Sequence, residues 1–571
     1  MIENKFSNSL VYLLALIFLF IYVNCQAQII DYQSPLNITL KLSGNFCEPR
    51  ADHFHSGIDI KTEGREGLPV FAVAEGFISR IKISSSGFGK VLYITHPDHK
   101  VTVYAHLNSF TGALHDSVEA LQYVKQSFEV EWFPDSTMFP IKKGQHIAWS
   151  GNSGGSEAPH LHFEIRDENT EEPLNPLMNG WIVEDTVAPS IDSIIIYQKK
   201  NNRSIYLDDA RCKISGAKFN DKDTITVNTD SVTIAFSGSD KMDDSLASSL
   251  GFYAVTLIAE KDTIYHFSFD KMNFNETRNV NAYIDYKRKE YDGTIYFRCF
   301  TLPGNSFNSF KNAGSGIILL NAGEIKQLKL IVADANSNCI EKVFYLRNRP
   351  VSIRSLKEEN GKVIQYPNSI ISKNWNNAEV VIPEGSFYET VEEPQFERKV
   401  NRKLKMPVLQ ITPKGFALKK PITIRIKPDY KYKSLERKLI VVELNDKESF
   451  KRSLGGTLSN GFVSATSRTF GVFTLVLDSI APEIGGINLE KDSVFNQWWL
   501  RVKIHDDLSG IKSYEGRIND KWVLFEFDAK SGLLSYQINN PFGLMLDIYI
   551  EAKDQSGNER ILKKQMKYLM E

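Results

Sequence analysis

The stretch 154-GGSEAPHLHFEI-165 places two histidines, His160 and His162, on either side of one leucine, directly after a turn rich in glycine and proline. Side chains alternate along a β-strand, so a strand here would point both imidazoles to one face and Leu161 to the other. Two imidazoles on one face can form a metal site, a catalytic pair or a polar surface. The stretch alone leaves these three interpretations open.

The composition indicates a multidomain globular protein. The chain has 571 residues, too many for one hydrophobic core, so we expect about two to five domains. Hydrophobic residues make up 42% and aromatic residues 11% of the chain, which is typical of folded domains rather than of long disordered segments. The 68 basic and 69 acidic residues nearly cancel, and this gives no support to a nucleic-acid partner, which usually needs a basic face.

The N-terminus has the pattern of a targeting segment. The apolar run 10-LVYLLALIFLFIYV-23 follows a basic residue and precedes 24-NCQAQ-28, which offers a small-x-small cleavage site. This pattern predicts that residues 1–27 are a secretory signal peptide. A retained membrane anchor is disfavoured because the run is short, and a lipoprotein modified at Cys25 is disfavoured because the residues just before it are not small. We therefore expect an exported protein with no transmembrane segment after signal cleavage.

Four cysteines remain after that cleavage, namely Cys47, Cys212, Cys299 and Cys339. Export permits disulfides, but these residues are widely spaced and form no Cys-x-x-Cys pattern. Their pairing cannot be assigned from the spacing, and some of them can be free thiols.

Strand signals dominate the mature chain. Segments such as 68-LPVFAVAEGFISRIKI-83 and 91-VLYITH-96 are rich in β-branched and aromatic residues and are broken by glycine turns. Only 111-TGALHDSVEALQYVKQSFEVEW-132 has apolar residues at helical spacing. The sequence therefore predicts a mainly β fold with one helix near residues 113–130.

An internal repeat divides the rest of the chain. The stretch 185-DTVAPSI-191 recurs as 478-DSIAPEI-484, each time between two strand-like runs. An acidic turn and then a closing strand and turn follow in both copies, as 239-SDKMDDS-245 with 331-IVADANSN-338 and as 506-DDLSGI-511 with 550-IEAKDQSGN-558. We expect a first domain over residues 28–184 and about three immunoglobulin-like β-sandwich modules over 185–348, 349–477 and 478–571. Nothing in the sequence assigns a ligand to these modules.

The histidines concentrate in the first domain. Nine of the eleven lie between His53 and His162, and histidine is the commonest metal ligand and acid–base group near neutral pH. In 50-RADHFHSGIDIKT-62, His55 and Asp59 are four residues apart with a glycine between them, a spacing that lets both side chains meet one ion. A polar surface loop is the alternative for this stretch.

The stretch 100-KVTVYAHL-107 alternates like a half-buried strand. The pattern places Thr102, Tyr104 and His106 on a polar face opposite the valines. His106 would then stand at the end of a strand, where it could reach a site or remain a surface residue.

Together these motifs resemble the lysostaphin-like (LytM-type) zinc metalloendopeptidases. The resemblance rests on His55-x-x-x-Asp59, on Tyr104-Ala105-His106, and on 151-GNSG-154 running into 159-PHLHFEI-165, and it covers roughly residues 40–170. Members of this family are peptidoglycan hydrolases with the compact antiparallel β fold of the duplicated hybrid motif.

The resemblance implies a role for each histidine of the motifs. His55, Asp59 and His162 would be the ligands of a Zn²⁺ ion, which leaves one position open as catalytic zinc requires. His106 and His160 would be catalytic residues beside the metal, accepting a proton from water and stabilising an oxyanion. The sequence contains no His-Glu-x-x-His motif, so a glutamate base is not implied.

The sequence departs from the family pattern in three places. Ser156-Glu157-Ala158-Pro159 replaces the usual Ser-Thr-Gly-Pro, and we expect Glu157 to face solvent. His53 is an additional imidazole, for which a surface position is the favoured interpretation. The segment between His106 and Gly144 is longer than the family's usual connection, which implies a helical insertion over about residues 110–140, and this helix could form a lid or a wall of the cleft.

The favoured function is an exported endopeptidase that cuts peptide stems or cross-links of bacterial peptidoglycan in the periplasm, at the outer surface or outside the cell. One alternative is a non-catalytic LytM-type regulator or binding protein that activates other wall hydrolases. Such relatives typically lose zinc ligands, whereas all the expected ones are present here. A second alternative is an endopeptidase that acts on extracellular protein. In a third alternative, the C-terminal modules carry the main function, as adhesion or spacing modules.

Overall fold

The computed structural model describes residues 32–567 apart from 181–182, 200–205, 209–213, 216–223, 243–248, 311, 350–362, 365–369, 376, 390, 393, 401–405, 413–416, 446, 493–496 and 539–544. The predicted signal peptide and Cys212 lie outside the described residues. Strands form most of the regular structure, so the predicted mainly β fold class is confirmed.

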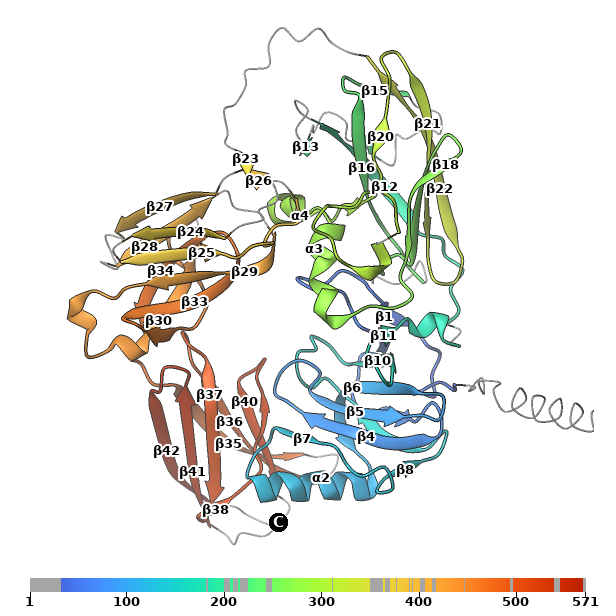
Figure 1. The fold of residues 1–571 in the computed structure, drawn as a ribbon. Helices are drawn as coiled ribbons and strands as arrows, with labels where there is room; N and C mark the ends of the chain where they lie inside the picture. Colours follow the sequence, from blue (N-terminus) through green and yellow to red (C-terminus); the bar gives the residue numbers. More distant parts are fainter. Residues whose placement is uncertain are drawn as a thin grey trace, which may run out of the picture.

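One sheet of eleven strands forms the first domain (Figure 1). Its central path is β1-β2-β10-β6-β5-β4-β7, and β3, β8, β9 and β11 pair beside this path. All its strand pairs are antiparallel. The strands are β1 (Leu42–Gly44), β2 (Ile58–Lys61), β3 (Pro69–Phe71), β4 (Gly76–Ile83), β5 (Lys90–Thr95), β6 (Lys100–Phe110), β7 (Val130–Trp132), β8 (Pro140–Ile141), β9 (His146–Ser150), β10 (His160–Asp167) and β11 (Pro173–Leu174).

The predicted helix in the insertion is α2 (Gly112–Lys125), which ends before the expected residue 130. It stops because Gln126 takes a left-handed conformation, with φ of 46°, and because Val130–Trp132 pairs with β4 as a strand instead. The ring of Tyr123, near the end of α2, contacts Trp522 of the C-terminal region at 5.3 Å between centroids. This contact joins the last turn of α2 to the C-terminal region.

Three pairs of sheets follow the first domain (Figure 1). We call them the first module (residues 190–348), the middle module (371–477) and the last module (483–567). Each pair encloses its own hydrophobic core, as expected for sandwiches whose inner faces are apolar. How many of them are immunoglobulin-like, and where the predicted boundaries lie, stay predictions.

The first module contains a six-stranded and a five-stranded sheet. In the second of these sheets β15 pairs with β22 in parallel, whereas the other pairs are antiparallel. Two short helices, α3 (Val280–Tyr283) and α4 (Tyr286–Asp292), lie between the sheets' strands in sequence. The strands are β12 (Ser190–Lys199), β13 (Tyr206–Asp208), β14 (Ile214–Ser215), β15 (Thr224–Val227), β16 (Ser231–Ser239), β17 (Ala254–Ala259), β18 (Asp262–Ser268), β19 (Phe297–Arg298), β20 (Ile318–Leu319), β21 (Ile325–Ala333) and β22 (Cys339–Asn348).

The middle and last modules are built from two five-stranded and two four-stranded sheets, respectively. A separate pair, β23 (Val363–Ile364) and β26 (Val391–Glu392), accompanies the middle module. Its other strands are β24 (Ile371–Trp375), β25 (Ala378–Ile382), β27 (Gln395–Val400), β28 (Pro407–Thr412), β29 (Ala417–Ile426), β30 (Leu439–Leu444), β31 (Phe450–Ser453), β32 (Thr457–Ser459), β33 (Phe462–Thr469) and β34 (Val472–Leu477). The last module contains β35 (Glu483–Asp492), β36 (Gln497–His505), β37 (Ile511–Ile518), β38 (Lys521–Trp522), β39 (Glu526–Asp528), β40 (Leu533–Ile538), β41 (Met545–Asp554) and β42 (Glu559–Lys567).

The chain turns back so that the first domain touches both the first and the last module (Figure 1). Asn45 and Gly251 join it to the first module by two hydrogen bonds, and Lys90 and Glu526 join it to the last module by an ion pair. Within the described residues, no helix combines the length and the apolarity that a membrane crossing requires. Cys47, Cys299 and Cys339 are free thiols.

Candidate metal centre

The centre is built on neighbouring strands of the first domain. His162 on β10 pairs in register with Asp59 on β2, and cross-strand partners share a face of the sheet. Leu161 and Phe163 point to the other face, where they are fully buried in the core. The alternation expected for the His-Leu-His stretch is therefore present, and it places His160 and His162 on the face that carries Asp59.

His55 reaches the same face from the loop that precedes β2. This loop approaches β10 closely at Gly57, where an added Cβ atom would lie 2.3 Å from the carbonyl oxygen of Phe163. Only glycine fits at that distance, which explains the glycine between His55 and Asp59. The spacing predicted to bring the two side chains together does so.

The three predicted ligands present one atom each to a common point. His55 Nε2 lies 3.0 Å from His162 Nδ1 and 3.0 Å from Asp59 Oδ1, and His162 Nδ1 lies 2.9 Å from Asp59 Oδ1. All three side chains are buried. Two imidazole nitrogens and one carboxylate oxygen at such short separations are a donor set that suits zinc.

The hydrogen bond made by the outer nitrogen of each imidazole determines which nitrogen can bind a metal ion. His55 Nδ1 lies 2.8 Å from the carbonyl oxygen of Asn45, so it must be the protonated nitrogen. His162 Nε2 donates to a carboxylate oxygen of Glu164 at 2.9 Å. When both rings are neutral, the two facing nitrogens therefore carry lone pairs, as does the Asp59 carboxylate. Three lone pairs that converge without a proton repel one another, and a cation at their centre removes this repulsion, so the residues fit a bound metal ion.

The charges around the centre favour a cation as well. Burial opposes ionisation of Asp59, but the neighbouring imidazoles of His55, His160 and His162 hold the pKa of this carboxyl well below its usual range. Burial also opposes protonation of His162, yet hydrogen bonds to Asp59 and Glu164 raise its pKa to about 9. The site therefore attracts one positive charge, either a proton or a metal ion. Arg50 Nη2, 2.6 Å from Asp59 Oδ2, occupies the outer oxygen of this carboxylate.

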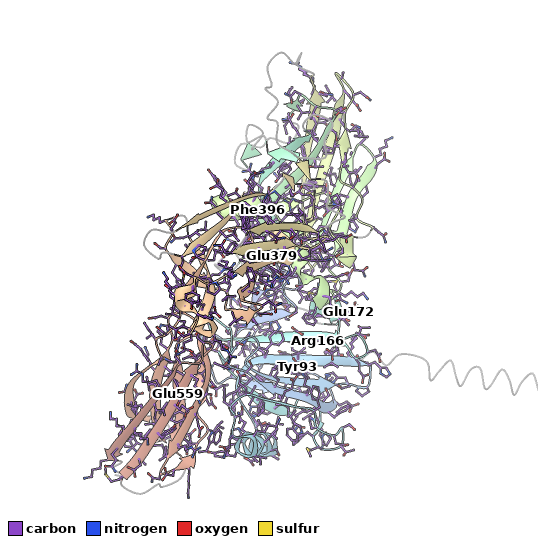
Figure 2. The ribbon with its side chains drawn as sticks, turned by 60° about the vertical axis from the view of Figure 1, so that its left-hand side comes forward. Tyr93, Arg166, Glu172, Glu379, Phe396 and Glu559 are labelled. Atoms are coloured by element: carbon purple, nitrogen blue, oxygen red, sulfur yellow. The ribbon has the colours of Figure 1, made fainter. Side chains whose placement is uncertain are left out.

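Glu164 is held in turn by its own partners. It is fully buried, accepts a hydrogen bond from Ser56, and lies 2.5 Å from the guanidinium of Arg166. Burial would raise the pKa of Glu164, but Arg166 and His162 lower it to about 2. Arg166 also lies 5.4 Å from the ring centroid of Tyr93 on the neighbouring part of the sheet (Figure 2). Partners of this kind fix the orientation of a ligating imidazole.

His106 reaches the centre in a way that its sequence pattern did not predict. Because Ala105 pairs with His162, regular alternation would turn His106 to the opposite face with Tyr104. The register between β5 and β6 shifts at this point, and His106 takes a left-handed φ of 57°. This bulge turns its ring toward His160, at 4.8 Å between centroids. The expectation of a polar face was wrong, since Thr102 and Tyr104 are fully buried.

His106 and His160 expose equivalent nitrogens. His106 Nδ1 donates to the carbonyl oxygen of Ser153, and His160 Nδ1 donates to that of Ala158, both at 2.8 Å. Each Nε2 therefore carries a lone pair. His160 Nε2 lies 3.4 Å from Asp59 Oδ1, directly beside the ligand atoms. Burial and the two neighbouring histidines lower the pKa of His106 to about 3, so its ring is neutral at ordinary pH.

The first module holds the segment that carries His55. Phe46, Cys47 and Phe54 belong to the hydrophobic core of that module rather than to the core of the first domain. Phe54 packs 4.8 Å from Phe307 between ring centroids, and its backbone N–H donates to the hydroxyl of Thr277 at 2.8 Å. Since Phe54 directly precedes His55, the position of this ligand depends on both domains.

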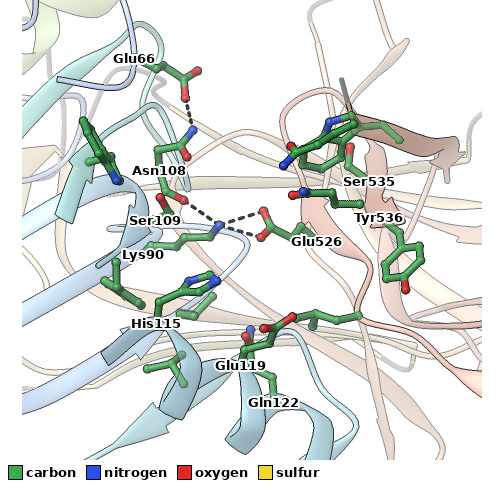
Figure 3. A pocket seen from close by; sticks show the side chains of 18 of the residues that line it. Glu66, Lys90, Asn108, Ser109, His115, Glu119, Gln122, Glu526, Ser535 and Tyr536 are labelled. Atoms are coloured by element: carbon green, nitrogen blue, oxygen red, sulfur yellow. Dashed lines mark hydrogen bonds and ion pairs between the residues drawn. The ribbon is translucent and has the colours of Figure 1, made fainter. Parts of the chain in front are cut away.

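The last module borders the loop next to His160. Lys530 donates to the backbone carbonyl oxygens of Asn152 and Ser156. A cavity of about 850 Å³ lies between the two units, bounded by α2 on one side and by residues such as Tyr536 on the other (Figure 3). Lys90 closes one part of it by its ion pair with Glu526 at 2.8 Å. Among the described residues, none of the three metal ligands lines this cavity.

The structure places the two remaining residues of the sequence analysis on the surface. Glu157 is exposed, and His53 is exposed and pairs with Asp52 at 2.9 Å. The sequence analysis missed Asn45, Arg50 and Glu164, all of which contact a metal ligand. Only Glu164 had a local signal, because it stands two residues after His162 on the same strand and so shares its face.

Two family comparisons match this chain. The sequence model of peptidase family M23 matches residues 53–129, within the first domain. A model of the Zu5-like domain matches residues 365–478, which include the middle module.

Individual relatives match the same part of the chain. The DD-carboxypeptidase/endopeptidase Mpg of Neisseria meningitidis is 30% identical over 123 residues, covering 22% of this chain and 22% of that protein. Lipoprotein NlpD of Yersinia enterocolitica is 30% identical over 114 residues, covering 20% of this chain and 91% of that protein. The catalytic domain of lysostaphin from Staphylococcus simulans is 26% identical, with 24% of this chain and 86% of that one covered and a TM-score of 0.18. The chain thus spans less than a quarter of the Neisseria relative's length.

Proposed function

We propose, from the premise that the chain belongs to peptidase family M23, that it is an exported zinc-dependent endopeptidase acting on the peptides of bacterial peptidoglycan. The observation that carries the proposal is the convergence of three lone pairs, from His55, Asp59 and His162, at one buried point. Two further imidazoles with free Nε2 atoms stand beside that point.

His55 Nε2, His162 Nδ1 and Asp59 Oδ1 would hold the zinc ion. A zinc ion with three protein ligands polarises a carbonyl group and lowers the pKa of water toward about 7. The hydrogen bonds from His55 to Asn45 and from His162 to Glu164 would orient both rings with their ligating nitrogens toward the ion.

His106 and His160 supply the acid–base chemistry. Each ring is fixed by its Nδ1–H on a backbone carbonyl, so each Nε2 can accept the proton of an attacking water. Once protonated, the same nitrogen donates to the oxyanion that forms at the scissile carbonyl or to the departing amine. Because the Ser153 carbonyl holds the Nδ1–H of His106, the neutral ring would present Nε2 as the base.

The substrate and the compartment come from the relatives and from the N-terminus. The relatives include a DD-carboxypeptidase/endopeptidase and a lipoprotein, and a signal-like segment precedes the first domain in the sequence. Together they support cleavage of peptidoglycan stems or cross-links after export to the periplasm, the outer surface or the surroundings of a bacterial cell.

The test uses the full mature chain, because the first module holds the segment before His55. Zinc is titrated by calorimetry into the metal-free protein and into His162→Ala, with the exposed His99→Ala as the matched control, and each protein is then incubated with purified peptidoglycan. We expect one zinc ion per chain and release of muropeptides, both lost in His162→Ala and both kept in His99→Ala. Tight zinc binding without release of muropeptides would favour a regulator over an enzyme, and absence of zinc binding would refute the proposal.

A further inference from the structure

Two groups of three aspartates lie outside the metal centre, one in the first module and one in the last. Asp185, Asp240 and Asp334 form the first group, and their nearest carboxylate oxygens all lie within 4.8 Å of one another. Asp478, Asp506 and Asp554 form the second group within the same limit. Both groups stand where the chain enters a sandwich, and the first directly follows the first domain.

The two groups occupy equivalent positions of the internal repeat. Asp185 and Asp478 each precede the first strand of their module by five residues. Asp240 follows the residue that pairs with the start of β12, and Asp506 follows the residue that pairs with the start of β35. Asp334 directly follows β21, and Asp554 ends β41. The repeat seen in the sequence therefore brings together the same three side chains twice.

One asparagine makes the same pair of hydrogen bonds in each group, and we call this arrangement the asparagine frame. The Nδ2 atom of Asn338 donates to the backbone oxygen of Asp185 at 3.0 Å and to the carboxylate of Asp334 at 2.7 Å. Asn558 makes the corresponding two bonds, to the backbone oxygen of Asp478 at 3.0 Å and to Asp554 at 2.7 Å. In each module this frame ties the entering chain to the loop that carries the third aspartate.

Each group contains a buried carboxylate oxygen without a hydrogen-bond partner. Asp240 is only 2% exposed and its Oδ1 has no partner, and Asp478 is only 1% exposed and its Oδ2 has no partner. An unpaired buried carboxylate is strongly unfavourable unless a cation compensates it. The two unpartnered oxygens belong to different positions of the repeat, yet each module has one buried carboxylate oxygen that a cation would satisfy.

The surrounding charges increase this cost in the first module. Burial, together with Asp334 and Asp185, raises the pKa of Asp240 to about 7. Burial and Asp334 likewise raise the pKa of Asp185. The groups that act on Asp240 are thus mutually repelling acids.

The ligand atoms indicate which cation would bind. All of them are oxygens, which suit a hard cation rather than zinc or copper. Oxygens bound to one calcium ion at about 2.4 Å lie within about 4.8 Å of one another, and one carboxylate oxygen from each aspartate of a group meets this condition. Magnesium requires shorter bonds and a stricter octahedron, and it keeps several waters.

We propose that the first and last modules each bind one Ca²⁺ ion, through Asp185, Asp240 and Asp334 and through Asp478, Asp506 and Asp554. Each ion joins the chain that enters a module to two loops of the same sandwich. The first ion thereby stiffens the junction between the peptidase domain and the first module, since Asn336 of the same loop binds the carbonyl oxygen of Val183, a residue of the first domain's core. The second ion does the same at the junction between the middle and last modules.

The test is a calorimetric titration of calcium into the full mature chain, freed of divalent ions and then loaded with one equivalent of zinc. We expect two calcium ions per chain, one in Asp240→Asn and one in Asp506→Asn, and none in the double variant. Asp507→Asn is the matched control, because Asp507 is adjacent to Asp506 but its side chain is 88% exposed. The His162→Ala variant should still bind two calcium ions, which separates this inference from the proposed peptidase activity.

Thermal melting distinguishes a variant that has lost calcium binding from one that has misfolded. Without calcium, Asp240→Asn should melt no lower than the wild type, because the change removes repulsion between buried acids. With calcium, the wild type should gain in melting temperature and the double variant should not. Calcium binding or stabilisation that persists in the double variant, or that magnesium reproduces in the wild type at equal concentration, would overturn the proposal.

Discussion

Replacing Phe54 by alanine tests whether the first module holds the metal centre in place. The side chain is fully buried, and its ring lies between Phe307, Phe269 and Tyr283 at centroid distances of 4.8, 5.5 and 6.0 Å. Removing a buried phenylalanine ring costs about 3–5 kcal/mol of unfolding free energy. Because residue 54 immediately precedes His55, the loss should also displace this ligand, and we expect zinc affinity to fall about 10–100-fold, as when a partner that orients a ligand is removed.

A second phenylalanine of the same core provides the control. Phe267 is 2% exposed and packs 4.6 Å from Phe310, but it is distant in sequence from every metal ligand. Urea denaturation of both variants should give a similar loss of stability, while calorimetry with zinc should show weakened binding only for Phe54→Ala. If both variants bind zinc as the wild type does, the first module does not position His55 and the reasoning is refuted.

Three further changes probe the centre and the acidic groups. Glu164→Gln leaves the guanidinium of Arg166 buried without its counter-ion, so urea denaturation should show a loss of about 3–5 kcal/mol of unfolding free energy. Calorimetry should show zinc binding weakened about 10–100-fold. Unchanged zinc affinity would contradict the conclusion that Glu164 orients His162. Gly57→Ala forces a Cβ atom against the Phe163 carbonyl, so zinc stoichiometry and peptidoglycan release should both fall, and full activity would show that the loop does not approach β10 so closely. The pKa of Asp240 in the folded protein is about 7, above its ordinary value of 3.8, so the folded state binds this proton more tightly than the unfolded state does. Without calcium, thermal melts should therefore show stability falling by at most about 4 kcal/mol as pH rises from about 4 to about 7. Asp240→Asn should flatten this trend.

The sequence contained much of the centre because its geometry is local. Alternation along β10 places His160 and His162 on one face, and the four-residue spacing of His55 and Asp59 needs only one tight turn at Gly57. The β-rich pattern likewise predicted the fold class, and the approximate place of the helix followed from its apolar spacing. Such features depend on neighbours within a few residues, so a single sequence carries them.

The position of His106 came from the tertiary structure alone. Its alternation pattern pointed to the wrong face, and a bulge imposed by pairing with β5 turned it back. The support from Asn45 and from the core around Phe54 also depends on packing against the first module, about 200 residues further along the chain.

The acidic groups show the same division between sequence and structure. The repeated motifs were visible in the sequence, but their convergence was not, because strand pairing and the asparagine frame bring together residues such as Asp185 and Asp334 from distant parts of a module. The sequence by itself determined which chemical groups this protein carries and their local spacing. Only the tertiary structure decided which of them share one buried volume, because contacts between distant strands depend on the packing of whole sheets rather than on any short stretch.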